Sequence, residues 1–100
     1  MASSVEYLTF VLDSLREVNG ISHKKMMGEF LLYKDGVLFG GVYDDRFLVK
    51  KTPSVVSLGL QEELPYEGAK PMLLVGADDA DEVKNIVLKV CSDLANKKQK

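Results

Sequence analysis

Residues 24–51 read KKMMGEFLLYKDGVLFGGVYDDRFLVKK, and this stretch decides the fold. It contains three apolar-rich segments separated by two short polar turns. The Asp35-Gly36 pair is the stronger turn signal, because both central residues of a type I′ hairpin turn need a positive φ. The stretch therefore predicts an antiparallel meander with strands near 29–34, 37–43 and 46–51.

Two-residue turns at both polar sites predict the register of the meander, in which Leu32 lies opposite Phe39 and Val42 lies opposite Phe47. One face is then apolar and is the expected core face: Leu31, Tyr33, Leu38, Val42, Phe47 and Val49. The other face is also apolar, with interleaved basic residues: Phe30, Leu32, Val37, Phe39 and Leu48, with Lys34, Arg46 and Lys50. We expect a terminal helix, the 53–70 segment or another subunit to cover part of this second face.

Amphipathic helices are predicted on both sides of the meander. Their apolar stripes are Leu8, Val11, Leu12 and Leu15 in the first helix, and Val83, Ile86, Val87, Val90 and Leu94 in the last. The first spans 3–18 with Ser3 and Glu6 as a capping box, and the last runs from a cap at Asp78 or Asp79 to about Asn96. The other segments are predicted as a connector at 21–28, an irregular stretch at 52–71 with one helical turn that points Val55 and Leu58 inward, and a short strand at 72–75. The expected fold is therefore α+β, as a single domain over 1–100.

Composition limits the class of protein. Hydrophobic residues make up 46% of the 100-residue chain, and the formal net charge of −2 gives no overall attraction to phosphate. Cys91 is the only cysteine, so no intrachain disulfide can form, which is typical of a reducing compartment. The sequence MASSVEYLTF does not have the pattern of a signal peptide, and no apolar run reaches the roughly 18 residues of a membrane span. We expect a cytoplasmic protein.

Few residues suggest chemistry. His23 is the only histidine and is expected in a connecting loop, so no zinc site and no oriented nucleophile–base pair is indicated. Cys91 is expected to be a partly buried, inert thiol. The acidic residues near 78–82 are expected to cap the last helix, Glu62 and Glu63 to be solvated loop charges, and Gly40-Gly41 to mark a bulge or a close backbone approach. We therefore expect no catalytic residue, no cofactor and no bound metal.

The candidate contact residues for a partner protein or a nucleic acid are mostly basic: Lys24, Lys25, Met27, Arg46 and Lys50. The alternative is that the lysines are solvated and Met26 fills the edge of the core.

The chain resembles the N-terminal domain family of TfoX/Sxy regulators. Lys24-Lys25-Met26-Met27-Gly28 resembles that family's Arg-Lys-Met-Phe-Gly signature, with Lys and Met in place of Arg and Phe. Tyr33-Lys34-Asp35-Gly36-Val37-Leu38-Phe39 is similar to its hairpin motif, and Asp44-Asp45-Arg46-Phe47-Leu48-Val49-Lys50 to its third strand motif. Pro65-Tyr66 and Lys70-Pro71-Met72 also fit its layout.

This resemblance implies a stand-alone N-terminal domain, without the second domain of full-length competence regulators. It implies a bacterial cytoplasmic protein linked to regulation of competence genes, which acts through a transcription activator and has no enzyme activity.

Three functions are compatible with the sequence. The first is a non-catalytic regulatory or adaptor domain that binds a protein partner, or a second copy of itself as a homodimer. The second is direct DNA binding through the Lys24-Lys25 loop and the basic strand residues. The third is a small-molecule-binding protein or enzyme, with a pocket between the sheet and the 53–71 segment that presents Tyr33, Tyr43, Tyr66 and Lys70.

Overall fold

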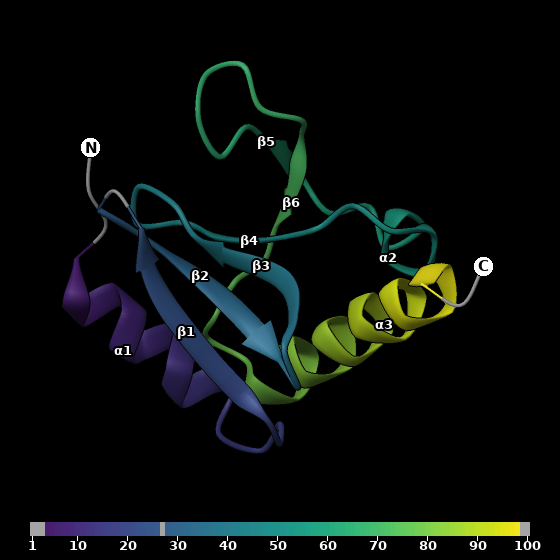
Figure 1. Cartoon of the computed structure of the whole chain (residues 1–100), viewed down its shortest axis with the longest axis horizontal. Coiled ribbons are helices and arrows are strands. Elements are labelled where there is room, and N and C mark those ends of the chain that lie inside the picture. Colours follow the sequence, from purple (N-terminus) through teal and green to yellow (C-terminus); the bar gives the residue numbers. More distant parts are fainter. Residues whose placement is uncertain (1–3, 27, 99–100) are drawn as a thin grey trace.

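A computed structural model of the chain shows two long helices packed against one face of a six-stranded antiparallel sheet (Figure 1). It describes residues 4–26 and 28–98. The elements are α1 (Val5–Ser14), β1 (Ile21–Met26), β2 (Glu29–Lys34), β3 (Val37–Val42), β4 (Phe47–Val49), α2 (Pro53–Val56), β5 (Glu62–Glu63), β6 (Met72–Leu74) and α3 (Ala80–Lys98). The strand order is β1-β2-β3-β4-β6-β5, so the predicted α+β class, terminal helices and antiparallel meander are confirmed.

Helix α1 begins one residue later than the sequence predicts. Ser4 is the N-cap, because its hydroxyl oxygen accepts a hydrogen bond from the backbone N–H of Tyr7 at 3.1 Å. The predicted cap, Ser3, lies outside the described residues. The backbone N–H of Ser4 also donates to the Asp45 carboxylate at 2.7 Å, which ties the start of α1 to the turn between β3 and β4. The helix ends at Ser14 instead of continuing to Val18, although the predicted apolar stripe does face the core.

Helix α3 begins at the predicted acidic cluster. The Asp79 carboxylate accepts hydrogen bonds from the backbone N–H groups of Asp81 and Glu82, at 3.1 and 3.2 Å. This is the capping geometry expected from the sequence. The stripe that the sequence predicts is buried at Val83, Ile86, Val87 and Val90 and partly buried at Leu94.

Strand β1 corrects the prediction of a connector at 21–28. Residues 21–26 pair with β2 along their whole length, from Ile21 opposite Lys34 to Met26 opposite Glu29. The prediction failed because all but the first residue of this edge strand are exposed, so the strand has no alternating apolar pattern. Backbone hydrogen bonds to β2 define the strand instead.

Both predicted two-residue turns are confirmed. Asp35 and Gly36 have φ values of 52° and 81°, and Asp44 and Asp45 have φ values of 53° and 57°. Positive φ at both central residues is the condition for a type I′ turn. Val42 lies opposite Phe47 as expected.

A bulge in β3 makes the predicted register wrong beyond the first hairpin pairs. Tyr33 pairs with Leu38, but Leu32 then pairs with Gly40, so Phe39 is an extra residue on β3. One extra residue reverses the parity of β3 relative to β2. The core face therefore takes Phe30 and Leu32 from β2, in place of the predicted Leu31 and Tyr33.

The core lies between this face and the helices α1 and α3, which contact each other. The sheet contributes fully or almost fully buried side chains to it: Phe30, Leu32, Phe39, Val42, Phe47, Val49, Leu73 and Val75. The opposite side of the sheet, here called the outer face, carries Leu31, Tyr33, Leu38, Leu48, Met72 and Leu74. Of these only Leu48 is fully buried.

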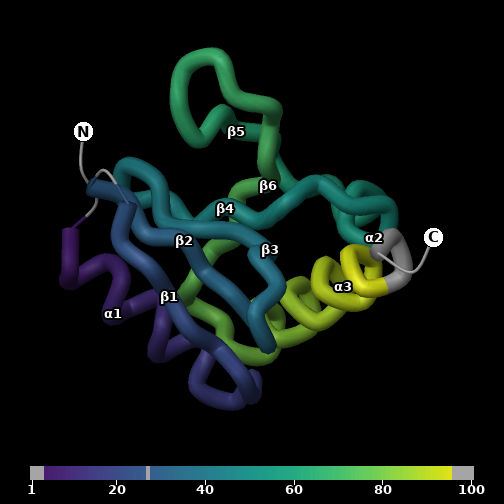
Figure 2. The backbone as a smooth tube through the Cα atoms, viewed as in Figure 1, coloured from purple at the N-terminus to yellow at the C-terminus, as the bar shows by residue number. Residues whose placement is uncertain are grey.

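The segment between β4 and β6 is more ordered than its sequence suggests. Val55 of α2 is buried as predicted, but Leu58 is 47% exposed and does not point inward. Glu62 and Glu63 form β5 instead of a solvated loop, and β6 joins the sheet beside β4. The loop between β5 and β6 extends away from the helices, at the top of the view in Figure 1 and, as a tube, in Figure 2.

Candidate functional site

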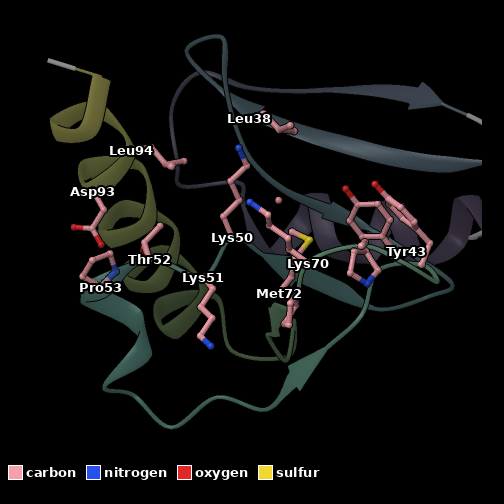
Figure 3. Close-up of a pocket in the computed structure, with 15 residues that line it drawn as sticks. Leu38, Tyr43, Lys50, Lys51, Thr52, Pro53, Lys70, Met72, Asp93 and Leu94 are labelled. Carbon is pink, nitrogen blue, oxygen red and sulfur yellow. The ribbon is translucent and has the colours of Figure 1, made fainter. Parts of the chain in front are cut away.

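A groove of about 1020 Å³ lies between the outer face, the loop that precedes β6 and the last turns of α3. Figure 3 shows the side chains that line it. Asp93 and Leu94 of α3 are at one end, Lys50 and Lys70 are in the middle, and Tyr43 is at the other end. The groove is therefore elongated, with a cationic centre and an aromatic end.

The aromatic end depends on two glycines in β3. A Cβ atom on Gly41 would come within 2.8 Å of the Tyr43 ring and 2.6 Å of the Phe30 carbonyl oxygen, so the ring lies directly over this glycine. A Cβ atom on Gly40 would collide with the backbone of β4 at Leu48. The prediction that this pair marks a bulge or a close backbone approach is confirmed, because the extra residue Phe39 directly precedes it and β4 comes close to Gly40.

Tyr43 and Tyr66 form the aromatic wall. Their ring centroids are 6.5 Å apart with an interplanar angle of 54°. Burial raises the pKa of Tyr43 above its ordinary value, and Tyr66 and Glu29 raise it further. The Tyr43 hydroxyl therefore stays protonated at neutral pH and can donate a hydrogen bond, while Tyr66 is 64% exposed and free to meet a partner.

Arg46 holds this wall together. Its guanidinium donates to the Glu63 carboxylate at 2.9 Å, to the Leu64 carbonyl at 3.0 Å and to the Tyr43 carbonyl at 3.2 Å. These bonds join the β3–β4 turn to β5 and so position the loop that carries Tyr66. Arg46 therefore has a structural role in this fold.

The three lysines of the groove differ in their pairing. Lys51 donates to the Glu62 carboxylate at 2.6 Å. Lys50, which is half-buried, and Lys70, which is exposed, have no ion pair within residues 4–26 and 28–98. Two cations of the groove are thus available for an anionic group.

The carboxylate at the α3 end is already engaged. Asp93 accepts hydrogen bonds from the Ser54 hydroxyl at 2.7 Å and from the Ser54 backbone N–H at 2.8 Å. These bonds lower the pKa of Asp93, and the nearby Thr52 hydroxyl adds to the effect. The Thr52 hydroxyl is itself buried and does not reach full hydrogen-bond geometry with any described residue. Asp93 therefore fastens α2 to α3 and keeps its negative charge, while the three lysines give the groove an excess of positive charge.

The predicted contact residues are not brought together into one patch. Lys24 is exposed on β1, in a row that continues through Leu31 and Gly41 to Leu48. Three strand spacings of about 4.8 Å therefore separate Lys24 from β4, and Lys50 directly follows the end of β4. Lys25 points to the opposite side of β1 from Lys24. Met27 lies outside the described residues.

Of the four residues that the sequence suggested for a pocket, Tyr43, Tyr66 and Lys70 line the groove, whereas Tyr33 does not. Lys51 and Asp93 also line it, and no sequence pattern groups these two residues with the tyrosines. They come from elements far apart in the chain, so only the tertiary structure reveals the set.

The residues with nucleophilic or basic chemistry lie apart from this groove. His23 is exposed on β1 and is not among the lining residues. Burial raises the pKa of the Cys91 thiol, although Lys34 opposes the shift. In the part of the chain that the structure describes, no group of His, Cys, Asp and Glu side chains is arranged to hold a metal ion.

Within the described residues, no helix combines the length and the apolar character needed to cross a membrane. Comparison with models of protein families, with curated proteins and with solved structures finds no match to this chain.

Proposed function

We propose that this chain is a non-catalytic regulatory or adaptor domain that binds a partner protein on its outer face. The observation that carries the proposal is that α1 and α3 pack against the core side of the sheet, so that the outer face is bordered only by the β5–β6 segment, α2 and the last turns of α3 (Figure 1). The TfoX-type resemblance implies the same kind of activity, with a transcription activator as the partner.

Partly exposed apolar side chains support a protein partner. Leu31, Leu38 and Met72 are only half-buried on the outer face, and the exposed Tyr66 continues this surface along the groove. Exposed apolar surface with a polar rim is typical of interaction sites. Tyrosine is also enriched at such sites because it combines a large apolar ring with a polar tip.

Direct DNA binding is less well supported. Sequence-independent affinity for DNA rises with the number of phosphates that a basic face neutralises. Lys24, Lys25 and Lys50 lie on different parts of the sheet, and Arg46 is paired with Glu63. An enzyme is also less well supported, because the Asp93 carboxylate of the groove is engaged by Ser54, and Cys91 does not line the groove and has a raised pKa that disfavours its reactive thiolate.

A peptide display library tests the proposal. Random peptides would be selected on the intact chain and then measured against two variants, Tyr66→Ser in the groove and Phe10→Ser on α1. The two changes are matched, since both replace an exposed aromatic ring, 64% and 46% accessible, on opposite sides of the sheet. We expect the selected peptides to lose about tenfold in affinity on Tyr66→Ser, which is about the effect of losing one buried aromatic contact.

No enrichment of peptides, or equal loss on both variants, would contradict the proposal. Sedimentation equilibrium of the intact chain and of Tyr66→Ser measures their oligomeric states separately. A dimer that dissociates on Tyr66→Ser would identify the partner as a second copy of the chain.

A further inference from the structure

We infer that the segment held in the groove is an extended acidic peptide whose carboxylates pair with Lys50 and Lys70. This inference rests on the proposed function and names the chemistry of the partner. Its basis is the juxtaposition of two lysines without ion pairs and an aromatic wall along a single groove.

The charge of the groove favours an anion. Lysines 50, 51 and 70 line it, and Asp93 is its only acidic lining residue. Lys51 is paired with Glu62 at 2.6 Å. Asp93 accepts hydrogen bonds from Ser54 at the α3 end and keeps its negative charge. The lining side chains therefore carry an excess of positive charge, and the two lysines without ion pairs lie in the middle of the groove (Figure 3).

The size and shape of the groove favour a peptide over a small molecule. Its volume of about 1020 Å³ is at the upper limit of the range of roughly 300–1,000 Å³ that is typical of pockets for drug-sized ligands. Its two ends differ in character, with the Tyr43–Tyr66 wall at one end and Leu94 at the other. A peptide can place carboxylates at the centre and apolar side chains toward both ends.

The distribution of charge also favours a peptide over a nucleic acid. Each nucleotide carries a phosphate, so a strand along the groove would bring negative charge past its rim as well as its centre. The segment 62–71, whose residues Pro65 and Tyr66 line the groove, contains Glu62, Glu63 and Glu67, and the chain as a whole has a net charge of −2. A peptide avoids this repulsion because its acidic residues need to lie only opposite Lys50 and Lys70.

Fluorescence anisotropy with defined probes tests the inference. The probe is a fluorescein-labelled nine-residue peptide in which Glu alternates with Leu and Tyr, and its control has Gln at every Glu position. We expect the Glu peptide to bind at least about tenfold more tightly than the Gln peptide, as one ion pair to the half-buried Lys50 and one to the exposed Lys70 would give. We also expect its affinity to fall as salt is added.

Charge reversal locates the contact. Lys50→Glu/Lys70→Glu is expected to lose that tenfold advantage, and the matched pair Lys24→Glu/Lys25→Glu on β1 to keep it within about twofold. Because Lys50 is half-buried, Lys70→Glu alone serves as a second variant at an exposed position, with an expected loss of about threefold. Circular dichroism confirms that each variant is folded.

Several results would overturn the inference. These are equal affinity for the Glu and Gln peptides, no binding of either up to about 1 mM, an equal loss on the β1 pair, or tighter binding of a nine-nucleotide oligothymidylate. The proposed function has a different failure. If selected library peptides are not acidic but depend on Tyr66, the outer face still binds protein and only the acidic assignment is wrong.

Discussion

Replacing Gly40 with alanine should destabilise the domain by forcing β3 and β4 apart. An added Cβ atom would fall on the carbonyl oxygen of Leu48 and lie 2.9 Å from the Cα atom of Val49. Both are backbone atoms of a strand that is buried on both sides, so neither can rotate away as a side-chain end would. The whole of β4 would have to move, together with its pairing to β3 and β6.

The size of the effect follows from two opposing terms. Forcing an extra group into a packed interior costs about 1–3 kcal/mol, and the rigid neighbours of Gly40 place this case at the upper end. Alanine also has less conformational freedom than glycine in the unfolded chain, and this difference stabilises the folded state by about 0.4–1 kcal/mol. The expected net loss is about 2 kcal/mol, which for a chain of this length lowers the melting temperature by about 8–16 °C.

Thermal and urea unfolding, followed by circular dichroism, measure this loss. Gly76→Ala is the matched control, because its added Cβ atom would approach only the side-chain oxygen of the exposed Asp78, at 3.0 Å. That oxygen can rotate away, so we expect the control to unfold within about 0.5 kcal/mol of the unmodified chain. A Gly40→Ala variant as stable as Gly76→Ala would show that β4 does not approach the bulge as described.

Three further predictions concern polar groups. Arg46→Ala should lower the free energy of unfolding by about 2 kcal/mol, because charge-assisted hydrogen bonds to Glu63 and to backbone carbonyls are lost. Urea unfolding measures this loss. An unchanged free energy of unfolding would mean that these bonds do not stabilise the fold. Ser54→Ala should raise the pKa of Asp93 in a carboxyl NMR titration. The folded-state pKa of Asp93 lies below its ordinary value of 3.8, so the stabilisation is present above pH 3.8 and is lost as the pH falls through the folded-state pKa. The difference in stability between the unmodified chain and Ser54→Ala should therefore be larger near neutral pH than in strong acid. Cys91 should react with an aromatic disulfide reagent at about pH 8 more slowly than free cysteine does, because burial raises its pKa; an equal or faster rate in the folded chain would contradict that burial.

The sequence predicted best those elements whose signals are local. The turns at Asp35-Gly36 and Asp44-Asp45 depend on the φ preferences of two residues each, and both were located correctly. The apolar stripes of α1 and α3 depend on helical spacing, and their buried residues were also correct. Strand β1 was missed because an exposed edge strand needs no apolar face, and Lys24 and Lys25 are the kind of residue that protects such an edge from aggregation.

The error in the core face came from a single residue. A hairpin with a two-residue turn fixes the register only until a bulge occurs, and Phe39 shifts the pairing of every residue that follows it. Gly40-Gly41 did indicate a bulge, but the position of the extra residue depends on which side chain the core can accept. Phe39 is completely buried, so its ring fills the core from the bulged position. That fit depends on the packing of α1 and α3, so the sequence of β3 alone does not predict it.

The same irregularity shapes the candidate site. Because Gly40 and Gly41 have no side chains, the backbone of β4 and the ring of Tyr43 can come close to β3, and Gly40 itself lines the groove. A larger residue at either position would separate the strands or displace the tyrosine ring, and it would also fill part of the groove. Stability and binding are therefore coupled at this point of the sheet. Substitutions at Lys70 and Tyr66, which are exposed and distant from the bulge in sequence, should separate the two properties, since they change the groove without changing the pairing of β3 with β4.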